Sequence, residues 1–451
     1  MKKIVRIIMS LFLVIAISLT LSSCGTTTVE PTKVNDVAKN AYIIAVEEGY
    51  DGTFTDWIIS LLVSGEYESI YELAVASGVF NGTIEDFIIS LKGDTGSTNL
   101  IDATSYALTS IVSIYCSFNQ KTTAQTIFGR ETTSTEKVSV TGSGVIYEMS
   151  GDGTAYIITN YHVVYDKESA PLISDEIYVF LYGMEYEKFK ISASYIGGSM
   201  QYDIAVLKVE SDYLKSESGY PYHSATLGDS SMLIAGSSVI AVGNARGKGI
   251  SVTNGIISVP NDNISMTLAD DETSANIRVI RNDALINAGN SGGGLFNSEG
   301  ILIGITNAKN VQENTEGLCY AIPINIAKAV ANQIIKKCNG DTITSIERVY
   351  LGVMVEVMES APVYNANGAL EIRQKVQVQE VSKDGDSVGK LAIGDELKYV
   401  TYNNETYPVL NLNSVEDVLL NVSVGESVTI GLIRDNTQYE VVITFTKGTA
   451  I

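Results

Sequence analysis

Short apolar runs separated by turn signals dominate the chain from residue 105 to residue 323. Runs of this length that are rich in Val, Ile and Tyr are typical of β-strands. Glycine and aspartate separate them, as in Gly151-Asp152-Gly153. The pattern predicts a mainly β region, and the number of strands suits two six-stranded barrels with a cleft between them. The expected strands are 111–118, 144–147, 155–159, 176–182, 204–209, 238–242, 256–259, 277–280 and 301–307.

A helical pattern follows this β region, and a different one precedes it. Apolar Ile326, Val330 and Ile334 recur every four positions, which predicts a helix over 326–337. Residues 41–92 hold two similar units, each read as two short helices around a glycine turn, with Trp57 and Phe87 as matching anchors. The units resemble repeats in surface proteins of Gram-positive bacteria, and we leave open whether they are a small helical spacer or a binding region. Residues 93–104 are predicted to be a linker.

The first 23 residues have the pattern of a secretory signal. Three basic residues lie before an apolar stretch over 7–21, which is short for a membrane span. The stretch ends in Leu21-Ser22-Ser23-Cys24, which resembles a bacterial lipobox. That resemblance implies cleavage before Cys24, lipidation of its thiol and a polar tether over 24–40, whereas the alternative is an uncleaved anchor helix. Either reading places the body of the protein outside the cytoplasm, attached to a membrane.

Composition restricts the classes of function. The chain has 451 residues, enough for two or three domains, and its net charge is −22. A strongly acidic protein lacks the basic footprint that nucleic-acid binding requires. Besides Cys24 there are three cysteines, Cys116, Cys319 and Cys338, and an odd number cannot all be paired, so we expect no essential disulfide.

No metal or other cofactor is expected. The acidic run Asp270-Asp271-Glu272 lacks the alternating ligand spacing of a calcium loop, so a solvated loop is the better interpretation. No cluster of histidines and cysteines indicates zinc.

Candidate chemistry centres on one serine within a glycine-rich stretch, Asn287-Ala288-Gly289-Asn290-Ser291-Gly292-Gly293-Gly294. A serine nucleophile needs a base, and the base needs a group to orient it. Of the two histidines, His162 ends a predicted strand, whereas His223 lies in a predicted loop. Asp203 opens a buried-looking strand, where a carboxylate requires hydrogen-bond donors. The order His162, Asp203, Ser291 excludes the α/β-hydrolase order and matches that of chymotrypsin-type double barrels.

With these residues the sequence resembles the HtrA/DegP group of trypsin-like serine proteases. The resemblance covers the chain from about residue 103 to its end. It departs at Ala288, Gly294 and Ala245-Arg246, where the group commonly has proline, proline and Pro-Phe. These departures concern the expected shape of the specificity pocket, and none of them removes His162, Asp203 or Ser291. The motifs that carry the resemblance are TNYHVV (159–164), DIAVLKV (203–209), LGDSS (227–231), AVGN (241–244) and NAGNSGGGLFN (287–297).

The resemblance implies a chymotrypsin-like double six-stranded β-barrel over residues 105–338, with Ser291 as nucleophile, His162 as base and Asp203 as its orienting acid. The N–H groups of Gly289 and Ser291 are expected to form the oxyanion hole. The resemblance also implies that one strand lines the substrate groove, as an edge that pairs with an extended peptide. Its residues are Tyr320, Ala321 and Ile322.

From about residue 347 the composition changes again. Tyr350, Leu351, Gly352 and Val353 resemble a PDZ carboxylate-binding loop, and residues 414–420 resemble the groove helix. The resemblance implies an α+β PDZ domain over 347–447 that binds peptide C-termini. The alternative is a generic β-domain packed on the protease.

The sequence therefore predicts an extracytoplasmic serine endopeptidase that acts on unfolded or damaged proteins. Two alternatives remain: a catalytically silent scaffold or holdase, and a surface adhesin with a secondary protease. The family also suggests a homotrimer, although no residue in the sequence demands one.

Overall fold

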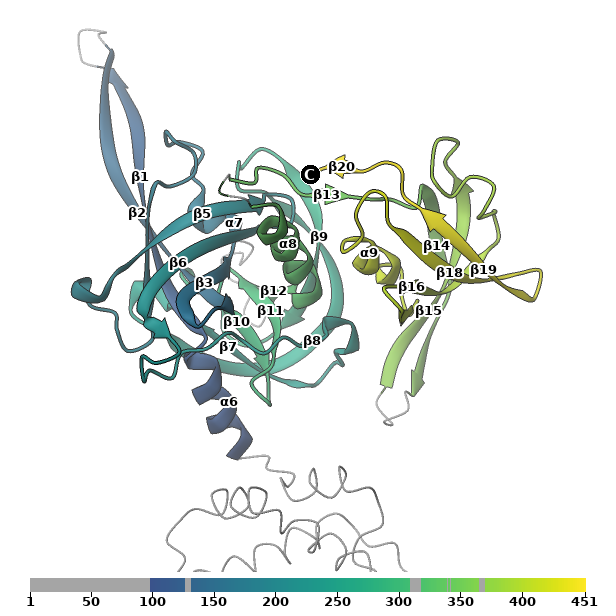
Figure 1. Ribbon diagram of the computed structural model, residues 1–451, viewed down its shortest axis with the longest axis horizontal. Coiled ribbons are helices and arrows are strands. Elements are labelled where there is room, and N and C mark those ends of the chain that lie inside the picture. The colour runs from purple at the N-terminus through teal and green to yellow at the C-terminus, as the bar shows by residue number, and fades with distance from the viewer. Residues whose placement is uncertain (1–97, 126–130, 309–317, 339, 341, 365–369) are drawn as a thin grey trace, which may run out of the picture. The chain divides into compact units, whose positions relative to one another are not determined.

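The computed structural model describes residues 98–125, 131–308, 318–338, 340, 342–364 and 370–451 (Figure 1). The predicted signal segment with Cys24, the tether and the two repeats lie outside the described residues. Residues 99–451 form one compact unit.

The first barrel closes in the strand order β1-β2-β3-β6-β5-β4, with every neighbouring pair antiparallel. Its interior is filled by branched and aromatic side chains such as Phe118, Ile157 and Leu207, which are fully or almost fully buried. Paired β1 and β2 continue beyond the barrel as a long hairpin (Figure 1). The strands are β1 (Ile111–Gln125), β2 (Glu131–Met149), β3 (Asp152–Thr159), β4 (Glu176–Leu181), β5 (Ile191–Ser199) and β6 (Ile204–Lys215).

The second barrel closes in the order β10-β11-β12-β9-β8-β7, so the prediction of two six-stranded barrels is confirmed. Its strand β10 is flanked by β11 on one side and by β7 on the other. This placement sets the two flanks of the site described below. The strands are β7 (Ser238–Gly243), β8 (Ser251–Thr267), β9 (Ser274–Asn282), β10 (Gly294–Asn297), β11 (Leu302–Asn307) and β12 (Cys319–Pro323).

One apolar core joins the two barrels. It contains Ile111 and Ile158 from the first barrel, Val242 and Phe296 from the second, and the buried face of helix α8 (Ile324–Lys337). Fully burying an aliphatic or aromatic side chain of this size contributes roughly 1.5–3 kcal/mol. Because the same core contacts both barrels, their relative position is fixed by packing.

A helix, α6 (Thr98–Leu108), takes the place of the end of the predicted linker and the start of the predicted β region. Ala103 and Ala107 lie four positions apart and are buried, which is the spacing of one helical face. A Cβ on Gly300 would meet the Ala103 backbone at 3.2 Å. Close packing against this turn buries that face of the helix.

The C-terminal part is a separate sheet with one helix. Its strands run in the order β14-β15-β16-β18-β19, with β17 beside β16, and its core includes Val376, Leu397, Ile430 and Phe445. Short strands β13 (Glu347–Arg348) and β20 (Thr449–Ala450) pair with each other. The elements are β14 (Val353–Tyr364), β15 (Leu370–Val381), β16 (Glu396–Tyr402), β17 (Glu405–Pro408), α9 (Ser414–Leu419), β18 (Ser427–Arg434) and β19 (Thr437–Thr444).

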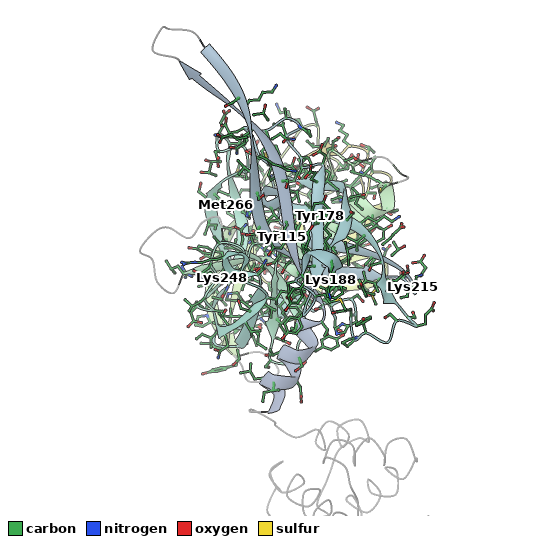
Figure 2. The ribbon with its side chains drawn as sticks, turned by 90° about the vertical axis from the view of Figure 1, so that its left-hand side faces the viewer. Tyr115, Tyr178, Lys188, Lys215, Lys248 and Met266 are labelled. Atoms are coloured by element: carbon green, nitrogen blue, oxygen red, sulfur yellow. The ribbon has the colours of Figure 1, made fainter. Side chains whose placement is uncertain are left out.

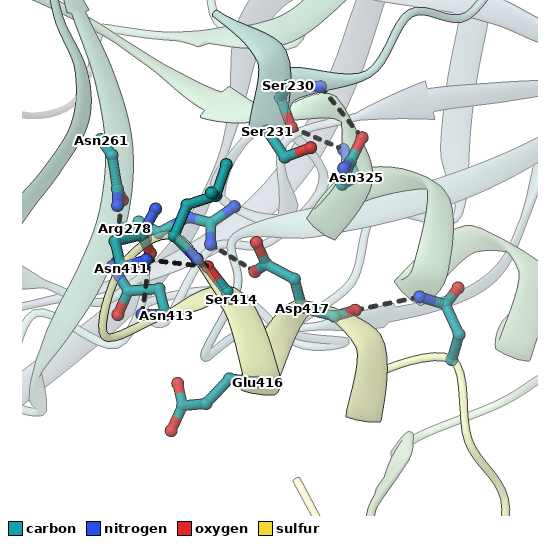
Figure 3. A network of polar contacts seen from close by, with 12 residues as sticks. Ser230, Ser231, Asn261, Arg278, Asn325, Asn411, Asn413, Ser414, Glu416 and Asp417 are labelled. Carbon is teal, nitrogen blue, oxygen red and sulfur yellow. Dashed lines mark hydrogen bonds and ion pairs between the residues drawn. The ribbon is translucent and has the colours of Figure 1, made fainter. Parts of the chain in front are cut away.

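Polar contacts connect helix α9 with the second barrel (Figure 3). Arg278 of β9 forms an ion pair with Asp417 of α9, and both side chains are largely buried. Asn413 Nδ2 donates to Asn261 Oδ1 at 3.0 Å beside them. Burial raises the pKa of the Asp417 carboxyl even though Arg278 opposes that shift. The junction therefore contains one desolvated charge pair beside neutral polar contacts, and Leu420, directly after α9, adds an apolar contact with the core around α8.

Two further observations concern the whole described part of the chain. None of its helices combines the length and apolar character needed to span a membrane. Cys116, Cys319 and Cys338 are free thiols, and burial raises the pKa of Cys116 to about 12. A thiol with so high a pKa is an inert, small apolar side chain at neutral pH.

Candidate active site

His162 lies on α7 (Tyr161–Val164), a single helical turn directly after strand β3. Val163 and Val164 are buried, and this fixes the turn against the first barrel. The His162 side chain is 19% exposed, and its Nδ1 is 2.7 Å from Oδ2 of Asp203. Since a carboxylate oxygen only accepts, Nδ1 carries the proton and Nε2 is left as the basic nitrogen.

Asp203 occupies the turn before β6 in a left-handed conformation, with φ of 50°. Aspartate tolerates this conformation better than most residues. Its side chain is 4% exposed, and its carboxylate accepts three hydrogen bonds. The backbone N–H of His162 donates at 3.0 Å, the His162 ring at 2.7 Å and Asn307 Nδ2 at 2.8 Å. A buried carboxylate requires such donors, so its position is set by them.

Ser291 is buried on a turn that requires glycine at two positions. Gly289 and Gly292 have φ of 93° and 84°, a region that residues with a Cβ avoid. A Cβ on Gly292 would meet the Ser143 carbonyl and Thr159 Oγ1 at 2.2 Å each. Ser143 N–H donates to the Ser291 carbonyl at 2.8 Å. The turn thus packs directly on strands β2 and β3, close to the start of α7.

The end of β11 contacts both Asp203 and Ser291. Asn307 donates to Asp203, and the next residue, Ala308, donates its N–H to Ser291 Oγ at 3.2 Å. Among the described residues, no hydrogen bond joins Ser291 Oγ to the His162 ring. Catalytic hydrogen bonds are often long or misaligned in structures without substrate and tighten when substrate binds.

The backbone N–H groups of Gly289 and Ser291 donate to no acceptor in the described part of the chain. The Ala288 carbonyl accepts the Arg246 N–H at 2.7 Å, and the Gly289 carbonyl accepts Ser143 Oγ–H at 2.7 Å. In a trans peptide the N–H points opposite to the carbonyl. The Gly289 N–H is therefore directed away from Arg246 and is available to an oxyanion.

Sequence reasoning missed two residues that hold this arrangement, Asn307 and Ser143. Ser143 Oγ also accepts the Asn244 N–H at 2.7 Å. Ser143 and Asn307 are both buried, and a buried polar side chain needs partners, but their burial becomes visible only in the fold. The second histidine is not part of the site: His223 stacks on Tyr106, and its Nε2 is 2.9 Å from Thr109 Oγ1.

The expected groove strand is positioned differently from the prediction. Tyr320, Ala321 and Ile322 lie on β12, which is paired with β11 on one side and β9 on the other. The expectation that this stretch is a free edge for a substrate strand is therefore wrong, because its main-chain partners are already taken. Ala321 and Ile322 are fully buried. Only the Tyr320 side chain is partly exposed, opposite Asn307 in the strand register.

In the C-terminal sheet, the predicted carboxylate loop borders a cavity of about 740 Å³ between β14 and α9. Tyr350, Leu351, Gly352 and Val353 line it together with Val415 and Leu419 of α9. Gly352 has φ of 70°, and the N–H groups of Leu351 and Gly352 donate to no acceptor in the described residues. These free donors lie beside a mainly apolar cavity.

No group of three or more metal-ligating side chains is present in the described residues. The site combines a paired histidine and carboxylate, a serine on a glycine turn and free backbone donors. A double barrel with this constellation defines the trypsin-like class, and the trypsin-like peptidase domain family matches residues 142–305.

Comparison with individual proteins identifies the family within the trypsin-like class. Serine protease Do-like HtrA of Bacillus subtilis (strain 168) is 30% identical over 353 residues, which cover 75% of this chain and 70% of that protein. The HtrA of Lactococcus lactis subsp. cremoris (strain MG1363) is 34% identical over 284 residues, covering 60% and 63%. A solved structure described as HtrA-type protease AlgW with decapeptide is 24% identical, covers 76% of this chain and 97% of that chain, and has a TM-score of 0.46. The chain belongs to the HtrA family of serine proteases.

Proposed function

We propose that this protein is an extracytoplasmic serine endopeptidase that hydrolyses peptide bonds of unfolded or damaged proteins, with Ser291, His162 and Asp203 as its catalytic residues. The observation that carries the proposal is the Asp203 carboxylate. It is buried, accepts three hydrogen bonds and orients His162 so that Nε2 is the basic nitrogen. A related protein of Bartonella henselae is named as a probable periplasmic serine endoprotease, which agrees with a place outside the cytoplasm.

In the proposed reaction, Ser291 Oγ attacks a substrate carbonyl while His162 Nε2 takes its proton. The N–H groups of Gly289 and Ser291 stabilise the oxyanion that forms. His162 then donates the proton to the leaving amine, and Asp203 stabilises the imidazolium in between. A water molecule then attacks the acyl-enzyme in the same way: His162 takes its proton and returns one to Ser291 Oγ as the acyl product leaves. We place the acyl part of the substrate along the β11–β12 flank, where the Tyr320 side chain is partly exposed.

For the C-terminal sheet we propose a PDZ function, the capture of a peptide C-terminus. The free N–H groups of Leu351 and Gly352 would hold the carboxylate, and the peptide would add a strand beside β14. β14 is the outermost strand of its sheet, so its far side has free main-chain groups for this pairing. A lipid anchor at Cys24 and a homotrimer complete the proposal, and both rest on the family resemblance.

A fluorophosphonate probe with a casein digest tests the main proposal. We expect the probe to label Ser291 in the wild type and casein to be degraded. Ser291→Ala should lose both, with turnover reduced by roughly 10⁶, a loss typical of removing such a nucleophile. Its thermal unfolding should stay close to that of the wild type. Absence of labelling and of cleavage in the folded wild type would instead favour a silent binding scaffold.

A further inference from the structure

Two exposed cations lie on the turn next to the Ser291 loop. Arg246 is part of the short turn η3 (Ala245–Gly247), and Lys248 follows it. Both side chains are exposed, and in the described part of the chain neither forms an ion pair. This basic turn occurs in a protein whose net charge is −22. The two unpaired cations therefore contrast with the acidic balance of the chain as a whole.

The basic turn is rigidly attached to the Gly289 backbone. Arg246 N–H donates to the Ala288 carbonyl at 2.7 Å. Ser143 Oγ bridges the Asn244 N–H and the Gly289 carbonyl with two bonds of 2.7 Å. Gly249 N–H also donates to Asn244 Oδ1 at 2.8 Å, which closes the turn on itself. The two cations thus have a defined position relative to the proposed oxyanion hole.

The topology decides which part of a substrate would pass over this turn. β10 follows Ser291 and has β11 and β7 on opposite sides. The β11 flank carries Asn307 and Ala308, and the acyl part of the substrate is placed there. The basic turn follows β7 on the other flank. A Cβ on Gly247 would meet Thr141 of β2 at 3.3 Å, so the turn also borders the first barrel.

We infer that Arg246 and Lys248 form a subsite for acidic residues on the leaving-group side of the cleaved bond. The inference rests on the proposed function, because it assigns substrate preference to the same site. A carboxylate two or three residues beyond the cleaved bond would lie near both cations. At short range each exposed cation attracts a carboxylate of the bound substrate, and salt weakens this attraction. The subsite selects acidic peptide segments.

Three internally quenched peptides test the inference. They are identical except for the second and third residues after the cleaved bond, which are Asp-Asp, Asn-Asn or Lys-Lys. For the wild type we expect kcat/KM for the Asp-Asp peptide to exceed that for the Asn-Asn peptide by roughly fivefold at low salt. The preference should shrink toward one in about 0.5 M salt, where the screening length is a few ångströms.

Two double variants test whether the substrate preference depends on the charges at positions 246 and 248. Arg246→Glu/Lys248→Glu should reverse the preference, so that the Lys-Lys peptide becomes the better substrate. Arg246→Asn/Lys248→Gln should abolish the preference, and asparagine suits the left-handed backbone at position 246, where φ is 56°. Lys188→Ala is the control, since Lys188 is exposed and is labelled away from Lys248 in Figure 2. It should keep the wild-type preference.

The outcomes distinguish the two proposals. If the Asn-Asn peptide is cleaved but the wild type shows equal kcat/KM for all three peptides, the subsite is refuted and the protease stands. A preference that survives in both double variants also refutes it. If no peptide is cleaved and the fluorophosphonate probe does not label Ser291, the proposed function itself fails.

Discussion

Asn307 Nδ2 lies 2.8 Å from Oδ2 of Asp203, the same oxygen that faces Nδ1 of His162 at 2.7 Å. One carboxylate oxygen thus receives hydrogen bonds from the histidine on the first barrel and from an asparagine at the end of β11 in the second. The acid is fixed by both barrels. Its orientation toward the ring therefore depends on the contact between them.

Asn307→Ala should lower kcat with little change in KM. A hydrogen bond to a charged group contributes about 1.5–3 kcal/mol, which corresponds to roughly a tenfold to hundredfold loss. Asn307→Ser, which keeps a donor, should recover part of the activity. Asn276→Ala, an exposed asparagine on β9, is the control. Steady-state kinetics on a peptide substrate provides the measurement. An unchanged kcat would show that Asn307 does not position Asp203.

Gly289→Ala should reduce the rate of fluorophosphonate labelling by roughly 10²-fold or more, the loss typical of one oxyanion-hole donor. The added Cβ would meet the Asn244 carbonyl at 2.3 Å and the Arg246 nitrogen at 2.7 Å, so the backbone has to move. Gly183→Ala is a matched control. Gly183 also has a positive φ, 78°, but a Cβ there meets nothing within 4 Å. If both variants label at the wild-type rate, the Gly289 N–H is not used.

Arg278→Ala should destabilise the junction at helix α9 by about 3–5 kcal/mol, because it leaves the buried Asp417 carboxylate without a partner. Replacing both residues, Arg278→Met with Asp417→Leu, should restore much of that stability. Arg373→Ala breaks the more exposed pair with Glu371 and should change stability by less than about 1 kcal/mol. Urea unfolding measures all three, and an equal effect of the two single variants would contradict the role of burial.

Glu426 predicts a pH dependence of stability. Its carboxylate accepts the Ser423 N–H at 2.8 Å and the Tyr402 hydroxyl at 2.7 Å. These bonds, the backbone one first, hold its pKa below the usual 4.5. A lowered folded-state pKa gives stability that is present above the unfolded pKa and is lost as pH falls through the folded pKa.

Glu426→Gln should therefore lower the melting temperature at pH 7, and the difference from the wild type should shrink at about pH 3. Melting curves at the two pH values measure this. Glu356→Gln, an exposed residue on β14, is the control. A difference that is equally large at both pH values would show that the carboxylate charge is not responsible.

The sequence predicted the barrels and the proposed catalytic residues because their signals are local. Strand runs alternate with turns, and His162, Asp203 and Ser291 each lie in a short motif. The contributions of Asn307 and Ser143 could not be read in the same way, since both lie within ordinary strand patterns and act only across the contact of the two barrels. Helix α6 was missed for a related reason: it depends on the close approach of Gly300 to Ala103. The blocked edge of β12 likewise depends on pairing with β9 and β11, which no single strand reveals.

The hydroxyl of Ser143 has a consequence for how activity would arise during folding. It belongs to the first barrel, yet it bonds to the Gly289 carbonyl and the Asn244 N–H of the second. Neither barrel can fix the orientation of the Gly289 peptide group by itself. A polypeptide cut between β6 and β7 should give two inert fragments, and reactivity of Ser291 should return only on their complementation.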